Sequence, residues 1–311
     1  MINFDGLFSL GAKDLGIEKP DKNDLTLISH AHSDHFPKNF NNNLFVCSSE
    51  TKNMVELKKQ KHLELTYPSE IISLNAGHTP GSNMFLINDL LYTGDFNTEE
   101  NFFGKATAVK CKTLIIETTF GKPKYIFPKR KIVTEEIRDY ILEKEKVQLM
   151  TSSVAFGKPQ EICLMLDKMK IPFNVSEEIS LINNKLGLNF NYLDKKAKVI
   201  IAPKSYESNE IKDHKKVLLS GWALDSMHGK FHKSFVFSDH CDYPSLIEFV
   251  EACDPEVIYT HHGFANEFAT DMRKIGFNAQ PLTNLTGKCN QKKQKTLLSF
   301  NISDNFKSKK I

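Results

Sequence analysis

Short apolar runs separated by polar turns recur through the first third of the chain. Runs of three to five apolar residues between turn residues predict buried strands. Asn88 and Asp89 separate two of these runs and favour a hairpin there. Many short strands with few helices among them predict two packed sheets with helices on the outside. The runs occupy positions 25–29, 44–46, 71–74, 84–87, 90–92 and 113–116.

A different pattern begins near Gly121-Lys122-Pro123, where strands and amphipathic helices alternate. Residues 130–145 carry apolar positions on one helical face and charges elsewhere. A second helix is expected over 157–170, where Pro159 suits the first turn. This alternation predicts a small α/β unit with a parallel sheet. Its strands are expected at 147–150, 199–201 and 217–219.

The first pattern resumes past residue 233. A strand is expected at 235–237, a helix from Pro244 to about Cys253, and a strand at 257–259. We therefore expect an α/β protein in which residues 1–122 and 233–285 form one domain and residues 123–232 an inserted second domain. The Lys-rich residues 286–311 are expected to form a loosely held tail.

Composition narrows the class of protein but does not give its function. The chain has 311 residues, of which 40% are hydrophobic and 25% charged, as in ordinary globular proteins. Its formal net charge of +3 is too small to indicate nucleic-acid binding by itself. Six dispersed cysteines without a CxxC pair favour buried thiols in a reducing compartment. Without a secretory leader or the roughly 18 apolar residues of a membrane helix, we expect a cytoplasmic protein that binds no membrane.

Four strong metal ligands fall within six residues, His30-Ala31-His32-Ser33-Asp34-His35, directly after the run at 25–29. In an extended backbone His30 and His32 point to the same side, because side chains repeat every two residues. Asp34 and His35 come where the chain must turn, so they can face a second ion. A polar loop that is merely rich in histidine is the alternative, but packing does not account for this density of ligands.

Three further candidates stand at the ends of expected strands. His78 lies between two glycines, where the backbone can approach an ion closely; an ordinary loop histidine is the alternative. Asp95 follows a glycine and could bridge two cations with its two oxygens, or be a turn or N-cap aspartate. His262 precedes a glycine in the same kind of setting. Its neighbour His261 points to the opposite face and is expected to be structural.

Taken together, these residues resemble the HxHxDH box and the later ligands of the metallo-β-lactamase fold in order and spacing. The resemblance implies an αββα sandwich with a dinuclear metal site. Histidine and carboxylate ligands suit two zinc ions, with manganese as the alternative. By this resemblance the first ion is held by His30, His32 and His78, the second by Asp34, His35 and His262, and Asp95 bridges the two.

Three segments resemble the motifs of the β-CASP branch of that fold. Glu117 resembles its motif A, His240 in Ser238-Asp239-His240-Cys241 its motif B, and His262-Gly263 its motif C. The branch inserts a domain between motifs A and B, where we expect the α/β unit at 123–232. Its members are nucleases of DNA or RNA, so the resemblance, which covers about residues 1–285, implies a phosphodiesterase.

This resemblance implies hydrolysis by a hydroxide that two ions activate. His240 is not required as a ligand and is free to be the general acid that protonates the leaving oxygen. Glu117 could orient the His240 ring and hold it protonated; an ion pair between Glu117 and a surface lysine is the alternative. Asp34 is expected to be both a metal ligand and a catalytic residue. The early acidic motif of the branch has no clean match, Asp5 and Asp14 being candidates.

RNA is the favoured substrate, because a histidine at motif C goes with the RNA-cutting members of the branch, among them enzymes that process mRNA 3′ ends. The alternatives are a DNA nuclease of repair, a thioester or ester hydrolase of small molecules, and a non-catalytic scaffold. The sequence is compatible with exonucleolytic and with endonucleolytic cutting, and with assembly into a homo-oligomer.

Two groups of residues near the inserted domain are candidates for contact with a polynucleotide. Gly157-Lys158 opens an expected helix and could meet a phosphate, as could a basic run at the entrance of the insertion, with a solvated surface as the alternative. Trp222, the only tryptophan, is expected to pack in the core, with base stacking as the alternative. The basic run consists of Lys122, Lys124, Lys129, Arg130 and Lys131.

Overall fold

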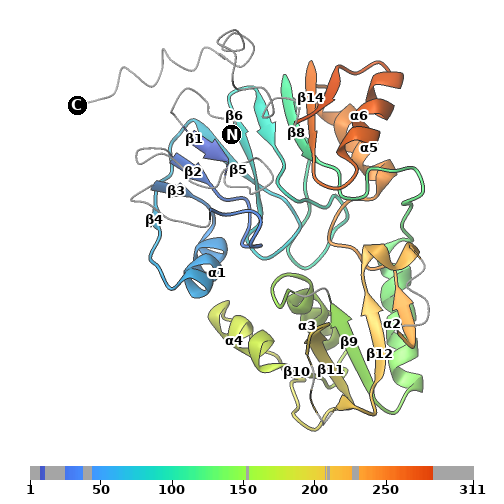
Figure 1. The fold of residues 1–311 in the computed structure, drawn as a ribbon. Coiled ribbons are helices and arrows are strands. Elements are labelled where there is room, and N and C mark those ends of the chain that lie inside the picture. Colours follow the sequence, from blue (N-terminus) through green and yellow to red (C-terminus); the bar gives the residue numbers. More distant parts are fainter. Residues whose placement is uncertain are drawn as a thin grey trace.

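The computed structural model describes residues 8–10, 25–37, 44–151, 154–206, 208, 211–225 and 231–282. Within these ranges the chain forms three sheets with helices around them, a mixed α/β fold (Figure 1). The expectations for Asp5, Asp14 and the tail at 286–311 lie outside the described residues. None of the described helices is long and apolar enough to span a membrane.

The first sheet consists of four parallel strands in the order β1 (Phe8–Leu10), β2 (Leu25–Leu27), β3 (Leu44–Val46) and β4 (Glu64–Leu65). Helix α1 (Ser49–Lys59) connects β3 with β4. It begins at Ser48, whose side chain accepts a hydrogen bond from the Thr51 N–H at 3.0 Å. Strand β2 ends three residues before His30, so this sheet supports the histidine-rich loop.

The second sheet consists of six strands in the order β15 (Ala279–Pro281), β14 (Val257–His261), β8 (Thr113–Glu117), β7 (Leu90–Tyr92), β6 (Asn83–Ile87) and β5 (Ile71–Asn75). Its interior strands β14 and β8 are parallel, and every residue of β8 is buried. Helices α5 (Tyr243–Cys253) and α6 (Ala265–Lys274) pack against them, with Phe249 and Phe268 in one apolar core with Leu114 and Ile116. Asn88, at φ 53°, makes the turn of the expected β6–β7 hairpin.

The third sheet consists of five parallel strands in the order β10 (Asn174–Val175), β11 (Val199–Pro203), β9 (Val147–Thr151), β12 (Lys215–Leu219) and β13 (Lys233–Phe235). Three α-helices accompany it: α2 (Arg130–Glu143), α3 (Lys158–Lys168) and α4 (Glu177–Lys185). We call the segment from α2 to β13 the five-stranded unit. The parallel α/β pattern expected for this part of the chain is confirmed.

Most expected elements are present with ends shifted by no more than two residues. Three short strands, β4, β10 and β15, lie outside the prediction, as do three helices, α1, α4 and α6. Each of these helices is short, at nine to eleven residues, and buries only three of them, so each offers few apolar positions from which to predict a helix. The strand expected at 235–237 is β13, which ends at Phe235 and pairs with β12. It therefore lies in the five-stranded unit and not in the resumed first pattern.

The three sheets set the position of the site. In Figure 1 the four-stranded and six-stranded sheets lie side by side in the upper part of the molecule, with α1 beside the first and α5 and α6 beside the second. This arrangement is the expected αββα sandwich. The five-stranded unit lies below it, with α4 next to α1. Loops from both parts meet between them.

Candidate metal centre

The ligand-type residues singled out in the sequence lie in loops that follow strands of the first two sheets. His30 and His32 follow β2, His78 lies between β5 and β6, and Asp95 follows β7. The loops are joined where the Asn83 N–H donates a 2.8 Å hydrogen bond to the carbonyl of Ser29. His262 comes directly after β14, at the end of the second sheet.

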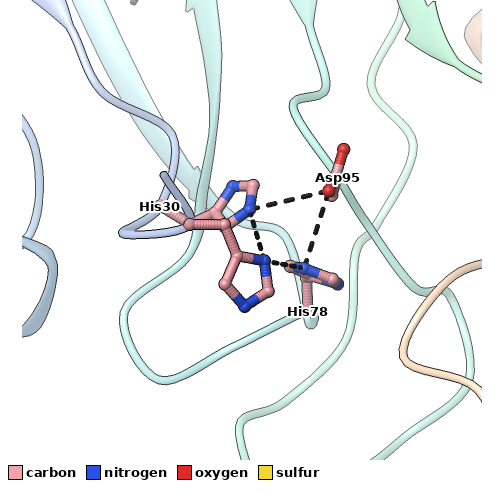
Figure 2. Close-up of side chains that lie close together, drawn as sticks. His30, His78 and Asp95 are labelled. Atoms are coloured by element: carbon pink, nitrogen blue, oxygen red, sulfur yellow. Dashed lines mark hydrogen bonds and ion pairs between the residues drawn. The ribbon is translucent and has the colours of Figure 1, made fainter. Parts of the chain in front are cut away.

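The first group brings together His30, His32, His78 and Asp95. His32 Nδ1 lies 3.0 Å from His30 Nε2 and 3.2 Å from His78 Nε2. Asp95 Oδ2 lies 3.6 Å from His30 Nε2 and 3.7 Å from His78 Nε2, and Figure 2 shows these three side chains pointing toward one another. Three imidazole nitrogens and one carboxylate oxygen thus lie within 4.8 Å of one another and could hold a metal ion.

Hydrogen bonds to carbonyl groups fix the protons of two of these rings on their outer nitrogens. His32 Nε2 donates to the carbonyl of Phe156 at 3.1 Å, and His78 Nδ1 donates to the carbonyl of Asp239 at 2.9 Å. Because a carbonyl only accepts, His32 Nδ1 and His78 Nε2 both present lone pairs to the centre of the group. Two lone pairs 3.2 Å apart repel each other, and a cation between them removes that repulsion.

The second group consists of Asp34, His35 and His262. The rings of His35 and His262 stack with their centroids 4.9 Å apart, and His35 Nε2 lies 3.7 Å from Asp34 Oδ2. The same His35 nitrogen lies 3.4 Å from Asp95 Oδ2. Asp95 therefore faces both groups, the position that the sequence resemblance implies for it.

A strained backbone presents His262. Its φ is 59°, a left-handed conformation that side chains other than glycine rarely adopt. The next residue, Gly263, has φ 51° and lies against the loop after β8, where a Cβ atom would come 2.5 Å from Thr119 Cα. Only glycine fits this contact. The close packing of Gly263 against the loop therefore fixes the position of the residue before it, His262.

The donor set fits a cation. Among the described residues, neither ring nitrogen of His35 nor Asp95 Oδ1 has a hydrogen-bond partner. Burial lowers the pKa of His30 and His35 well below the usual range and that of His32 and His78 to about 4, so all four rings are neutral at pH 7, the form that binds metals. Burial also raises the pKa of Asp95 to about 6, because the charged carboxylate is destabilised away from water. A bound cation offsets this destabilisation.

Glu117 and His240 form a buried pair beside the first group. His240 Nδ1 donates to Glu117 Oε1 at 2.9 Å, and Glu117 Oε2 accepts from the Thr119 N–H at 2.8 Å. Burial alone lowers the pKa of His240, but the Glu117 carboxylate raises it to about 9. Burial alone raises the pKa of Glu117, but His240 lowers it to about 2. The pair is thus an imidazolium and a carboxylate at neutral pH, and His240 carries a proton on Nε2. A cavity of about 310 Å³ opens beside this ring.

Asp239 is a residue that the sequence did not single out. Its Oδ1 lies 2.9 Å from Lys158 Nζ and 4.0 Å from His240 Nε2. Burial raises the pKa of Asp239, but Lys158 and the neighbouring histidines hold it well below its usual range. Lys158 is 7% exposed, so it pairs within the protein and the prediction that it meets a phosphate is wrong. The feature of the sequence that could have identified Asp239 is its position next to His240.

Arg130 also binds within the protein and not at a phosphate. Its Nη2 lies 2.6 Å from both carboxylate oxygens of Glu161, and its Nη1 donates to the carbonyl of Ser238 at 2.7 Å. The guanidinium lies 4.3 Å over the ring of Phe237. It therefore joins α2 and α3 to the segment that carries His240.

The remaining candidates of the sequence lie nearer the surface. Lys122 pairs with Glu267 at 3.0 Å, and Lys124 pairs with Asp225. Trp222 does not lie in the core: its side chain is 39% exposed.

Known proteins resemble the chain over part or most of its length, although no family model matches it. It is 30% identical over 292 residues to a probable DNA ligase of Opitutus terrae, an alignment that covers 82% of this chain and 28% of that protein. It is 29% identical over 175 residues to the DNA cross-link repair 1A protein of Mus musculus, which covers 49% of this chain and 17% of that protein. It is 28% identical over 182 residues to an RNase J-like protein of Methanocaldococcus jannaschii, an alignment that covers 46% of this chain and 43% of that protein.

The first three curated relatives are much longer than this chain, which spans 13% to 28% of their lengths. Among solved structures, a protein of unknown function from Enterococcus faecalis V583 is similar with a TM-score of 0.58 and 13% identity, over 88% of this chain and 84% of that one. This similarity extends through both the sandwich and the five-stranded unit and supports the fold.

Proposed function

Since the chain belongs to the β-CASP branch of the metallo-β-lactamase fold, we propose that it is a metal-dependent nuclease that hydrolyses phosphodiester bonds. The observation that carries the proposal is the meeting of two ligand groups at Asp95 with the Glu117–His240 pair beside them. A small-molecule hydrolase would leave that pair without a role.

Two metal ions are proposed for the site. The first is held by His30, His32 and His78, the second by Asp34, His35 and His262, with Asp95 between them. Zinc suits three imidazoles with a carboxylate, and manganese is the alternative. When bound, such a pair of ions supplies an activated water and offsets negative charge on the phosphate.

The remaining residues of the site handle the proton of the leaving group. His240 is proposed as the general acid, because it carries a proton on Nε2 at neutral pH and lies at the edge of the first group. Glu117 holds the ring by its Nδ1 and keeps it protonated. Asp239 keeps the His78 ring in its orientation through its backbone carbonyl, and Lys158 holds the Asp239 side chain.

For the substrate we favour DNA in place of the RNA predicted from the sequence. The relative that aligns with 82% of the chain is named a probable DNA ligase, and others are named for DNA cross-link repair. RNA is the second candidate, supported by the histidine at motif C, His262, and by the RNase J-like relative.

A direct comparison of substrates tests both parts of the proposal. Purified protein would be incubated with end-labelled single-stranded DNA and RNA of equal sequence, at equal metal and salt, since salt alone shifts affinity strongly. We expect hydrolysis that chelator abolishes and zinc or manganese restores, with DNA cut faster. RNA cut faster than DNA would favour the second candidate. Metal-loaded protein that cuts neither polymer would contradict the proposed function.

A further inference from the structure

A cluster of aromatic rings lies beside His240 and has no role in the chemistry described so far. Phe120 stands at its centre, with its ring centroid 6.0 Å from His240 and 4.7 Å from Trp222. The other members contact Phe120 or Trp222: Tyr125, Phe127 and Phe264. Phe120 lies in the loop after β8, which ends at Glu117, and Phe264 follows His262 after β14. Trp222 follows β12 of the five-stranded unit.

Trp222 is the most exposed member of the cluster, since Phe127 and Phe264 are only partly exposed. Phe120 and Tyr125 are buried, while 39% of Trp222 is exposed. Trp222 lies in a short 3₁₀ helix, η3 (Gly221–Leu224). The backbone N–H of Trp222 donates a 3.2 Å hydrogen bond to Ser220 Oγ. At Gly221 a Cβ atom would lie 2.5 Å from Phe120 Cζ, so the absent side chain lets the helix lie directly on the ring. The indole therefore has a fixed place with one part packed and one part open.

Two lysines lie over rings that contact the indole of Trp222. Lys122 Nζ lies 4.1 Å from the ring centroid of Phe264, and Lys124 Nζ lies 4.6 Å from that of Tyr125. Each lysine also has an ion pair with a surface carboxylate. Pairs of this kind at the surface contribute little free energy, so either ammonium can turn to a phosphate instead. The surface thus offers an aromatic face with two ammonium groups nearby, each held by a surface ion pair.

We propose that Trp222 stacks on an unpaired nucleobase close to the scissile phosphate, so that the substrate strand is single-stranded where it leaves the site. The inference rests on the proposed nuclease function. Phe120 contacts both His240 and Trp222, so a base on the indole belongs to a nucleotide near the reacting one. Aromatic rings beside cations are the recurring surface for single strands, because every base has a face that stacks. A base inside a duplex has both faces covered and cannot use this surface.

The single tryptophan gives a direct test of stacking, since the chain has no other. Protein kept in chelator, which prevents cutting, would be titrated with single-stranded DNA, blunt duplex DNA, and a single strand with abasic sites. We expect saturable quenching of tryptophan emission by the single strand, and little by the duplex or the abasic strand. Equal quenching by the abasic strand would overturn the proposal, because phosphate contact alone would then explain the signal.

Substitutions separate stacking from general apolar contact. Trp222→Ala is expected to raise the Kd for single-stranded DNA about 5- to 150-fold, the range for one base–aromatic stack, and Trp222→Phe to restore most of the affinity. Leu224→Ala is the matched control, because Leu224 lies in the same helix, is 40% exposed and cannot stack. Binding would be followed by fluorescence anisotropy of a labelled oligonucleotide, and folding by thermal unfolding.

The outcomes distinguish this inference from the proposed function. Wild-type protein that cuts DNA without quenching, or whose Kd is unchanged in Trp222→Ala, would overturn the stacking site alone. An equal loss of affinity in Leu224→Ala would also overturn it. Wild-type protein that shows the expected quenching but does not cut when metal is supplied would overturn the nuclease and leave a single-strand-binding surface.

Discussion

The ability of the histidine cluster to take up a cation depends on two backbone carbonyls. Phe156 and Asp239 accept the outer protons of His32 and His78, and this leaves the inner nitrogens as bases. Phe156 belongs to the five-stranded unit, immediately before α3, whereas His32 belongs to the sandwich. One ligand of the first group is therefore oriented by the other unit of the chain.

Removal of the Asp95 carboxylate tests the metal site. Asp95 Oδ2 faces His30, His78 and His35, so Asp95→Ala takes one ligand from both groups. We expect metal content to fall from about two equivalents and nuclease activity to be lost. Elemental analysis of protein purified without chelator measures the first effect. A variant that retains both ions would remove Asp95 from the bridging role.

Replacement of His240 separates proton transfer from metal binding. Because His240 is assigned no ligand role, His240→Ala is expected to keep its metal and to lose about 10²- to 10⁴-fold in kcat, the usual contribution of a general acid. The same elemental analysis serves as the control. Loss of an ion from this variant would mean that His240 is a ligand and not the acid.

The Glu117 carboxylate sets the pH range in which His240 stays protonated. The folded-state pKa of His240 is about 9, above the ordinary value near 6.5, so its acid form is complete at low pH and is lost as pH rises through 9. Glu117→Gln removes the charge that causes this rise, and we expect the alkaline limb of the kcat–pH profile to move to lower pH. A limb that does not move would show that Glu117 acts only as a structural partner.

At the residue scale, the sequence contained most of the site. The box at His30–His35 and the isolated His78, Asp95 and His262 could be found because each stands at a strand end beside glycine or within a dense run. Asp239 and Phe156 could not, since one acts through a salt bridge and a carbonyl and the other through a carbonyl alone. The sequence alone does not show which backbone carbonyls the fold places beside a histidine ring.

At the scale of elements, the buried ion pair of Arg130 and Glu161 holds α2 against α3. The side chains are 10% and 3% exposed, and Glu161 accepts two hydrogen bonds at 2.6 Å from Arg130 Nη2. Burial raises the pKa of Glu161 even though Arg130 lowers it, so the carboxylate depends on its partner to stay charged. Loss of one partner alone leaves an unpaired charge in the interior.

A double-mutant cycle measures this contribution. Arg130→Met is expected to lower the free energy of unfolding by about 3–5 kcal/mol, and Arg130→Met with Glu161→Leu by much less, because the pair is then replaced by apolar side chains. Urea denaturation of the two single variants and the double variant gives the coupling energy. Additive losses would mean that the pair does not act as a unit.

Helices were harder to predict than strands for a reason that α1 illustrates. Its apolar periodicity is weak, because only Thr51, Met54 and Val55 are buried and most of the remaining residues are polar and half-buried or exposed. The Ser48 cap was a usable signal, but serine is also common in turns. Strands such as β8, with every residue buried, leave a continuous apolar run that stands out.

For the whole molecule, the net charge of +3 bears on how salt affects binding. Each phosphate contact to a single strand contributes a slope of about −0.7 to log K against log salt. If Lys122 and Lys124 make the main contacts, the expected slope is about −1.4, and Lys124→Gln moves it about 0.7 toward zero. Titrations between 50 and 200 mM salt measure it. A slope of about −5 or steeper would require a basic surface elsewhere.

The pairing of β8 with β14 has a consequence for how the protein is made. The Thr118 hydroxyl donates to the carbonyl of His262, 144 residues further along the chain. A ribosome adds roughly 5–20 residues per second, so on the order of ten seconds separates the synthesis of these two partners. During that interval β8 lacks one neighbouring strand, and the second group of ligands is incomplete. A nascent chain released early would carry the histidine box without His262, and therefore without a complete second group of ligands.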